Sequence, residues 1–119
     1  GIAYVNPQCS LLGRMIAWDD TSVEASLIES LRSAIDLRKK FTLTADTTAC
    51  RLVHGEADGV PGFIADYYGT VLVVQSATAG VDALLPCIIE ELKKHIPCTA
   101  IIERSHSPSR KEEGLNSHE

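Results

Sequence analysis

The chain lacks several features that would assign it to a common class of protein. No apolar run approaches the roughly 20 residues needed to cross a bilayer, and no basic segment followed by an apolar one predicts a secretory leader. The four cysteines have neither CxxC spacing nor matching histidine pairs, so neither a metal site nor a disulfide framework is predicted. A reducing, cytoplasmic setting is therefore expected.

Positive charge is also scarce. Lys and Arg number 11 against 16 Asp and Glu, which gives a net charge of −5 over 119 residues. Because RNA is bound first through neutralisation of its phosphates, the chain alone is expected to bind RNA weakly. The length suits one domain with a modest core, with room for part of a second.

An amphipathic helix is predicted over residues 22–40, after a strand over 11–18. Its apolar positions recur every four residues, at Val23, Leu27, Leu31 and Ile35. Thr21 and Glu24 have the spacing of a capping box at its start. Three cations end it, Arg38, Lys39 and Lys40. The helix dipole favours positive charge there, and an RNA-binding patch is the alternative interpretation.

Strands are predicted over 50–54, 63–67 and 71–76, which are rich in β-branched and aromatic residues. The last two strands are joined as a hairpin through Tyr68 and Gly69.

Residues 80–96 then have helical spacing that Pro86 interrupts. A turn over 80–85 followed by a helix from about 86 to 95, or a kinked helix, is expected. A strand over 98–103 follows, and a strand–helix–strand connection of this length usually makes a right-handed crossover to a parallel neighbour. The predicted fold class is therefore α/β (α+β), a small mixed sheet of ββαβ type with an additional N-terminal amphipathic helix.

The densest pattern in the chain lies at residues 51–69, which read RLVHGEADGVPGFIADYYG. Its turn is built from three glycines and a proline, Gly55, Gly59, Pro61 and Gly62. These residues suit a backbone that takes positive φ and then a fixed φ. A dinucleotide-binding loop is not predicted, because a strand follows the glycines where a helix is required. Asp58 is expected to hydrogen-bond the turn, while Glu56 or Asp66 could hold a cation.

This segment resembles the run RLVHGEADGLPGLIVDRYG in the bacterial class I, S-adenosylmethionine-dependent ribosomal RNA large-subunit methyltransferase I family, whose members methylate C5 of a cytosine. Upstream, the resemblance rests on Asn6, Pro7, Ser10, Arg14, Trp18 and Asp19. Downstream, it rests on residues 71–75, 78–80, 102–105, 110, 111 and 113–115.

The resemblance implies a division of the chain into four parts. These are the end of a PUA-like domain (1–20), a helix and linker (21–48), a central α/β domain (49–105) and an exposed tail (106–119). The catalytic Rossmann-like domain, with S-adenosylmethionine and the nucleophilic cysteine, is expected to be absent from this chain. No catalytic, cofactor-binding or metal-binding residue is therefore expected in it.

Two Pro-Cys pairs, at Cys87 and Cys98, are similar to the pair that contains the nucleophile in many cytosine-C5 methyltransferases. Cys87 is expected to adjoin the apolar face of a helix and Cys98 to begin a buried strand, so both should act as small hydrophobes.

The candidate RNA-binding residues are Arg51, His54, Arg104, Arg110 and Lys111. For His54 a structural hydrogen bond to the turn is the competing role. For the last three, a solvated loop of mixed charge is the alternative.

The predicted function is that of the RNA-orienting central domain of a 23S rRNA cytosine-C5 methyltransferase, inactive by itself. Its expected partners are ribosomal RNA, the missing catalytic domain and a second copy of the chain that pairs open sheet edges. The alternative is a free-standing, non-catalytic module that binds RNA or protein.

Overall fold

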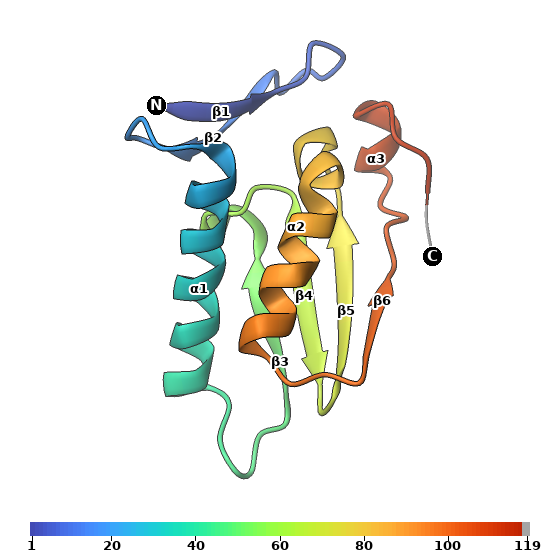
Figure 1. Ribbon diagram of the computed structural model, residues 1–119. Helices are drawn as coiled ribbons and strands as arrows, with labels where there is room; N and C mark the ends of the chain where they lie inside the picture. The colour runs from blue at the N-terminus through green and yellow to red at the C-terminus, as the bar shows by residue number, and fades with distance from the viewer. Residues whose placement is uncertain (118–119) are drawn as a thin grey trace.

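The structure, a computed structural model, describes residues 1–117. In chain order its elements are β1 (Ile2–Val5), β2 (Gly13–Ala17), α1 (Val23–Phe41), β3 (Ala49–His54), the 3-10 turn η1 (Gly55–Asp58), β4 (Phe63–Tyr68), β5 (Val71–Ser76), α2 (Ala79–His95), β6 (Ala100–Glu103) and α3 (Ser109–Glu112) (Figure 1). No helix within this described range is long and apolar enough to cross a membrane.

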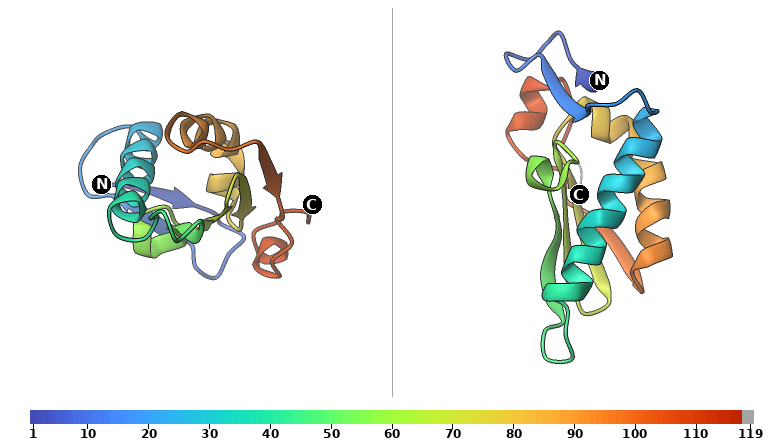
Figure 2. Two further views of the ribbon diagram at one scale, coloured as in Figure 1. Left: turned by 90° about the horizontal axis from the view of Figure 1, so that it is seen from below. Right: turned by 90° about the vertical axis from the view of Figure 1, so that its left-hand side faces the viewer.

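A four-stranded sheet in the order β3-β4-β5-β6 carries the fold. The first two pairings are antiparallel and β5 pairs parallel with β6, so the predicted mixed ββαβ sheet is confirmed. Helices α1 and α2 cover one face of the sheet, whereas the short α3 lies toward the other face (Figure 2). We call this second face the open face.

The core lies between the sheet and the two long helices. Fully buried apolar side chains come from every layer, among them Leu31, Ile35, Leu52, Phe63, Leu72, Val74 and Leu92. The periodicity of α1 places its apolar stripe against the sheet, as expected. In β4 and β5 every second side chain is buried against the helices, and the side chains between them lie on the open face.

The start of α1 differs from the prediction by one residue. Ser22, which has an extended backbone, caps the helix, and its Oγ accepts a hydrogen bond from the Ala25 N–H at 3.1 Å. Thr21 instead donates its hydroxyl to Asp19 Oδ1. The proposed capping box at Thr21 is therefore wrong, since the helix begins at Val23 and the cap must stand directly before it.

Helix α2 is continuous from Ala79 to His95, with Pro86 inside it. The turn expected over 80–85 is therefore wrong. The helix begins early because Thr78, in an extended conformation, caps it by accepting from the Val81 N–H at 3.3 Å. Pro86 lies on the exposed side of the helix.

The segment after β6 is not an exposed tail. Ser105 and Arg110 are each 1% exposed and Glu113 is 7% exposed. Arg110 is anchored through Nε and Nη1, which donate to the carbonyl oxygens of Asn116 and Ser76, both at 2.6 Å. The bond from Arg110 to the Asn116 carbonyl oxygen makes the segment part of the folded domain as far as residue 116.

The strand predicted over 11–18 is β2, and it pairs with β1, which the sequence did not indicate. The two strands form an antiparallel ribbon across one end of the helices and sheet (Figure 1). Apolar side chains remain exposed on this ribbon and its flanks, with Val5 65% and Trp18 86% exposed.

Candidate functional site

A pocket of about 300 Å³ lies at the ribbon end of the open face. Its lining comes from the end of β3, η1, the start of β4, the end of β5 and the segment that follows β6. Arg14 reaches it from β2. The pocket therefore draws on residues from 14 to 109, which the sheet topology brings together.

The glycine-rich turn forms one wall of this pocket. Gly55, Gly59 and Gly62 all have positive φ, at 53°, 75° and 82°, as the sequence predicted. At Gly62 the requirement is twofold, because a Cβ there would lie 2.3 Å from Thr78 Cγ2. The backbone thus passes directly against the N-cap of α2, and only glycine fits.

The side chain of Asp58 stabilises this turn by hydrogen bonds to His54 and Arg38. Its Oδ2 accepts from the His54 N–H at 2.7 Å, and the carboxylate forms a two-pronged pair with Arg38 at 2.8 and 2.9 Å. Burial opposes ionisation of Asp58, but these hydrogen bonds and the charge of Arg38 outweigh it, so its pKa lies below the usual value. The expected turn-forming role of Asp58 is confirmed, and Arg38 ties the turn to the end of α1.

A row of side chains crosses the open face at the pocket. Register pairs His54 with Ile64 and Ile64 with Gln75, and Arg104 continues the row because its N–H bonds the Val74 carbonyl. All four members of the row line the pocket. The row therefore offers an imidazole, an aliphatic surface, an amide and a guanidinium in sequence across the sheet.

The two arginines of the pocket differ in their partners. Arg14 pairs with Glu56 at 3.0 Å, so its charge is locally balanced. Arg104 is exposed and forms no ion pair with any residue of the described range 1–117. The preceding Glu103 lines a different hollow beside α2. Arg104 is thus the guanidinium in this pocket that is available to an anion.

Hydroxyl groups complete the pocket on the side of α3. Ser107 Oγ and Ser109 Oγ lie 2.8 Å apart and share a hydrogen bond, which leaves one of the two hydroxyl protons free. Ser105 Oγ accepts from the buried Ser76 N–H at 2.9 Å and so fixes the start of the segment against β5.

The candidate RNA-binding residues do not all reach this surface. His54, Arg104 and Lys111 are exposed, and the first two line the pocket. Arg51 lies on the open face beyond it, paired across the strands with Asp66 at 2.9 Å. Arg110 is buried and bonds to Ser76, Asn116 and Asp82, so its assignment to RNA binding is wrong.

The cations at the end of α1 are largely engaged within the fold. Arg38 pairs with Asp58, and Lys39 donates to the His95 carbonyl at 2.6 Å. Lys40 lies over its neighbour Phe41, 5.2 Å from the ring centroid. These contacts favour the structural interpretation of the cluster.

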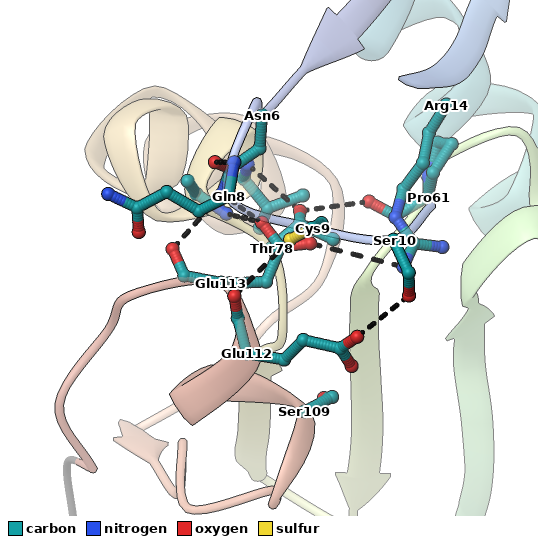
Figure 3. A network of polar contacts seen from close by, with 12 residues as sticks. Asn6, Gln8, Cys9, Ser10, Arg14, Pro61, Thr78, Ser109, Glu112 and Glu113 are labelled. Atoms are coloured by element: carbon teal, nitrogen blue, oxygen red, sulfur yellow. Dashed lines mark hydrogen bonds and ion pairs between the residues drawn. The ribbon is translucent and has the colours of Figure 1, made fainter. Parts of the chain in front are cut away.

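A network of polar contacts around Glu113 joins three distant segments behind the pocket (Figure 3). Glu113 Oε2 accepts from Asn6 Nδ2 at 2.9 Å and from the Ala79 N–H at the start of α2 at 3.1 Å. Ser10 donates to Glu112 Oε1 at 2.9 Å. Burial opposes ionisation of Glu113, but the bonds from Asn6 and Ala79 prevail and place its pKa below the usual value. Sequence reasoning missed this network, since Glu113 lies 107 residues from Asn6 and 34 from Ala79.

Relatives of known description match the chain closely. It is 33% identical over 112 residues to ribosomal RNA large subunit methyltransferase I of Erwinia tasmaniensis, a match that covers 92% of this chain and 28% of the relative. It is 46% identical over 68 residues to the protein of the same description from Shewanella amazonensis, covering 57% of this chain and 17% of that protein. No protein-family model matches the chain. The chain belongs to the ribosomal RNA large subunit methyltransferase I family.

Solved structures agree with this membership. A candidate SAM-dependent methyltransferase from Streptococcus mutans matches with a TM-score of 0.66 and 25% identity, over 77% of this chain and 25% of that one. A candidate methyltransferase complexed with SAH matches with a TM-score of 0.67. The chain spans about a quarter of the length of these structures and 28% of the Erwinia relative.

The cysteines of this member of the family lie away from the pocket. Cys87 is exposed, so its predicted place on the apolar face of α2 is wrong. Because α2 is continuous from Ala79, Leu85 and Ile88 lie on its buried face and Cys87 lies on its exposed face. Cys98 is half-buried against the core, and β6 begins two residues after it. No group of His, Cys, Asp and Glu within residues 1–117 could hold a metal ion.

Proposed function

We propose that this chain is the RNA-orienting central domain of an S-adenosylmethionine-dependent 23S rRNA methyltransferase that acts on C5 of a cytosine. The observation that carries the proposal is the pocket on the open face, in a chain that is 33% identical to a ribosomal RNA methyltransferase. Arg104 lies in this pocket with His54 and Gln75 and forms no ion pair with the part of the chain that the structure describes. Guanidinium, imidazole and amide groups on an accessible sheet suit RNA, which is bound through phosphates and unpaired bases.

The proposed role is orientation of the substrate, because the described residues do not fit a bound S-adenosylmethionine. The glycine-rich turn leads into strand β4 where such a site needs the N-terminus of a helix. The space beside Gly62 is filled by Thr78, so the turn forms no cradle for a ligand. We therefore expect S-adenosylmethionine to be bound elsewhere in a longer protein. A cytoplasmic location of that protein would follow from its proposed substrate, 23S rRNA.

The excess of acidic residues limits the affinity of the chain for RNA. The net charge of −5 repels phosphates at distances comparable to the Debye length of about 8 Å at physiological salt. Exposed cations near the pocket, Arg104 and Lys111, must therefore act at short range. Binding to RNA is expected to be weak and to fall steeply with salt.

Methyl transfer by the longer enzyme tests the proposal. Arg104→Ala should raise KM for 23S rRNA several-fold and leave kcat nearly unchanged, because a group that positions RNA contributes equally to ground-state and transition-state binding. Lys40→Ala removes the same charge at the far end of α1 and should leave both constants unchanged. An unchanged KM in Arg104→Ala, or methylation of a base other than cytosine, would contradict the proposal.

The ribbon supports a second candidate function, a non-catalytic interaction module. Val5, Met15 and Trp18 expose apolar surface on the ribbon and its flank, and such surfaces mark protein contacts when they are contiguous. A homodimer through this surface or through the edges of the sheet is a prediction that sedimentation can check. A Trp18→Ser variant should then shift the chain toward monomer. Monomer alone at high concentration for the unaltered chain would contradict it.

A further inference from the structure

We propose that the pocket on the open face holds one unpaired nucleotide of single-stranded RNA, with its base over Ile64 and against Gln75 and its phosphate at Arg104. The inference rests on the proposed function and adds the class of RNA and the residues that read it. The proposed nucleotide pocket binds RNA away from the base that is methylated, so it takes no part in the methyl-transfer step itself.

The geometry of the row supports a base lying on the sheet. Ile64 is half-exposed in the middle of the row and gives a flat aliphatic surface, with His54 on one side and Gln75 on the other. Unpaired bases stack on imidazole and guanidinium planes as well as on aromatic rings. A base over Ile64 would therefore have His54 as a π partner on one side and the amide of Gln75 on the other.

Gln75 gives the pocket a means of reading the base. Its primary amide carries two donor hydrogens and an acceptor oxygen, and within the described part of the chain it bonds to no other group. That pattern matches the Watson–Crick edge of a base, which presents donors and acceptors side by side. In a duplex this edge is occupied by the opposite strand, whereas an unpaired nucleotide can present it to Gln75.

Charge and size select a single nucleotide. Arg104 is the guanidinium of the pocket that no carboxylate within residues 1–117 neutralises, since Arg14 is paired with Glu56. One available guanidinium suits one phosphate, which its planar fork can bind in two places. The cavity of about 300 Å³ stands at the lower end of the range for small-ligand pockets, about 300–1,000 Å³.

Ser107 and Ser109 provide the remaining polar contact. Their shared hydrogen bond leaves one hydroxyl donor free on the α3 side of the pocket. A ribose 2′-hydroxyl both donates and accepts, so it can bond to this serine pair. The pocket thereby has a means of preferring RNA over DNA.

Anisotropy measurements with labelled oligonucleotides test the inference on the chain as it stands. A single-stranded RNA should bind at least about tenfold more tightly than the duplex of the same sequence. Gln75→Ala should weaken binding of the single strand about tenfold and leave duplex binding unchanged, as expected for the loss of one or two hydrogen bonds. Arg104→Ala should weaken it further and reduce the salt slope by about 0.7, the value for one phosphate of a single strand. Lys40→Ala is the charge-matched control, and unfolding midpoints establish that each variant is folded.

Three results would overturn the inference. Equal affinity for duplex and single strand, or single-strand binding that Gln75→Ala and Arg104→Ala leave unchanged, would refute the nucleotide pocket and leave the proposed RNA-orienting role standing. Absence of RNA binding in the unaltered chain, together with an unchanged KM of Arg104→Ala in the longer enzyme, would refute both.

Discussion

Arg110 donates a hydrogen bond from Nη1 to the carbonyl oxygen of Ser76 at 2.6 Å, and so links α3 to the end of β5 across 34 residues. The same nitrogen lies 3.0 Å from Asp82 Oδ1 in α2. With 1% of its surface exposed, this guanidinium is a structural group that holds the segment after β6 against the sheet. The wall of the pocket at Ser107 and Ser109 depends on that attachment.

Arg110→Ala should therefore destabilise the fold by about 3 kcal/mol, because it leaves two carbonyl oxygens and a carboxylate without their buried partner. The neighbouring exposed Lys111→Ala is the matched control and should change the free energy of unfolding by less than about 0.5 kcal/mol. Urea unfolding of the two variants measures the difference. Equal, small effects would show that Arg110 is not held as the structure describes.

A second pair of variants separates backbone conformation from steric contact. Gly62 and Gly69 both have positive φ, 82° and 68°, but a Cβ would lie 2.3 Å from Thr78 at Gly62 and meets no atom within 4 Å at Gly69. Gly69→Ala should cost about 1 kcal/mol for the left-handed conformation alone. Gly62→Ala should cost at least about 2 kcal/mol more, because the cap of α2 must move. Thermal or urea unfolding checks the order, and equal costs would contradict the close approach.

These two cases show what the sequence can and cannot predict. The glycine turn and its Asp58 were predicted because positive φ and side-chain-to-backbone bonds are local properties of a few adjacent residues. Arg110 was misassigned, since an arginine in a polar loop carries the same local signature whether it is solvated or buried. Its burial is decided by Ser76 and Asp82, which are 34 and 28 residues away.

The same distinction explains the elements. The amphipathic helix α1 follows from periodicity, which reports burial directly. The mixed sheet follows from the length of the connection between β5 and β6, which favours a parallel pair. The turn over 80–85 is wrong because the rule against an internal proline outweighed the capping threonine Thr78. The alternative, a helix that runs through Pro86, agrees with the extent of α2. The pocket was missed as a unit, since its lining comes from five separate segments that only the sheet order brings together.

The pair of Asp58 and Arg38 predicts a specific dependence on pH. The pKa of Asp58 is lowered in the fold, so the pair stabilises the protein above the unfolded pKa of about 3.9 and loses this effect as pH falls through the folded value. Asp58→Asn should cost about 2 kcal/mol at pH 7, and the gap to the unaltered chain should narrow below pH 4. Asp36→Asn, at an exposed site on α1, is the control and should show no such gap. A constant gap across this range would contradict the assignment.

Glu113 predicts a local opening of the ribbon with the sheet left intact. Its Oε2 alone bonds both Asn6 and the first N–H of α2, while Arg14 lies 4.0 Å from Oε1. In Glu113→Gln the negative charge that strengthens both hydrogen bonds and faces Arg14 is lost. The ribbon should therefore detach more often, and amide hydrogen exchange in residues 2–17 should accelerate about tenfold, equivalent to about 1.4 kcal/mol.

Exchange in the strands of the sheet measures whether this opening is local. Amides of β4 and β5 bond to one another and to β3 and β6, so they should exchange at the rate of the unaltered chain. Glu90→Gln, which removes an exposed pair with Lys93, is the matched control and should leave the ribbon unchanged. Acceleration in the sheet as well would mean that Glu113 stabilises the whole domain. Acceleration confined to the ribbon would establish Glu113 as the residue that fixes the ribbon, and with it Arg14, at the edge of the pocket.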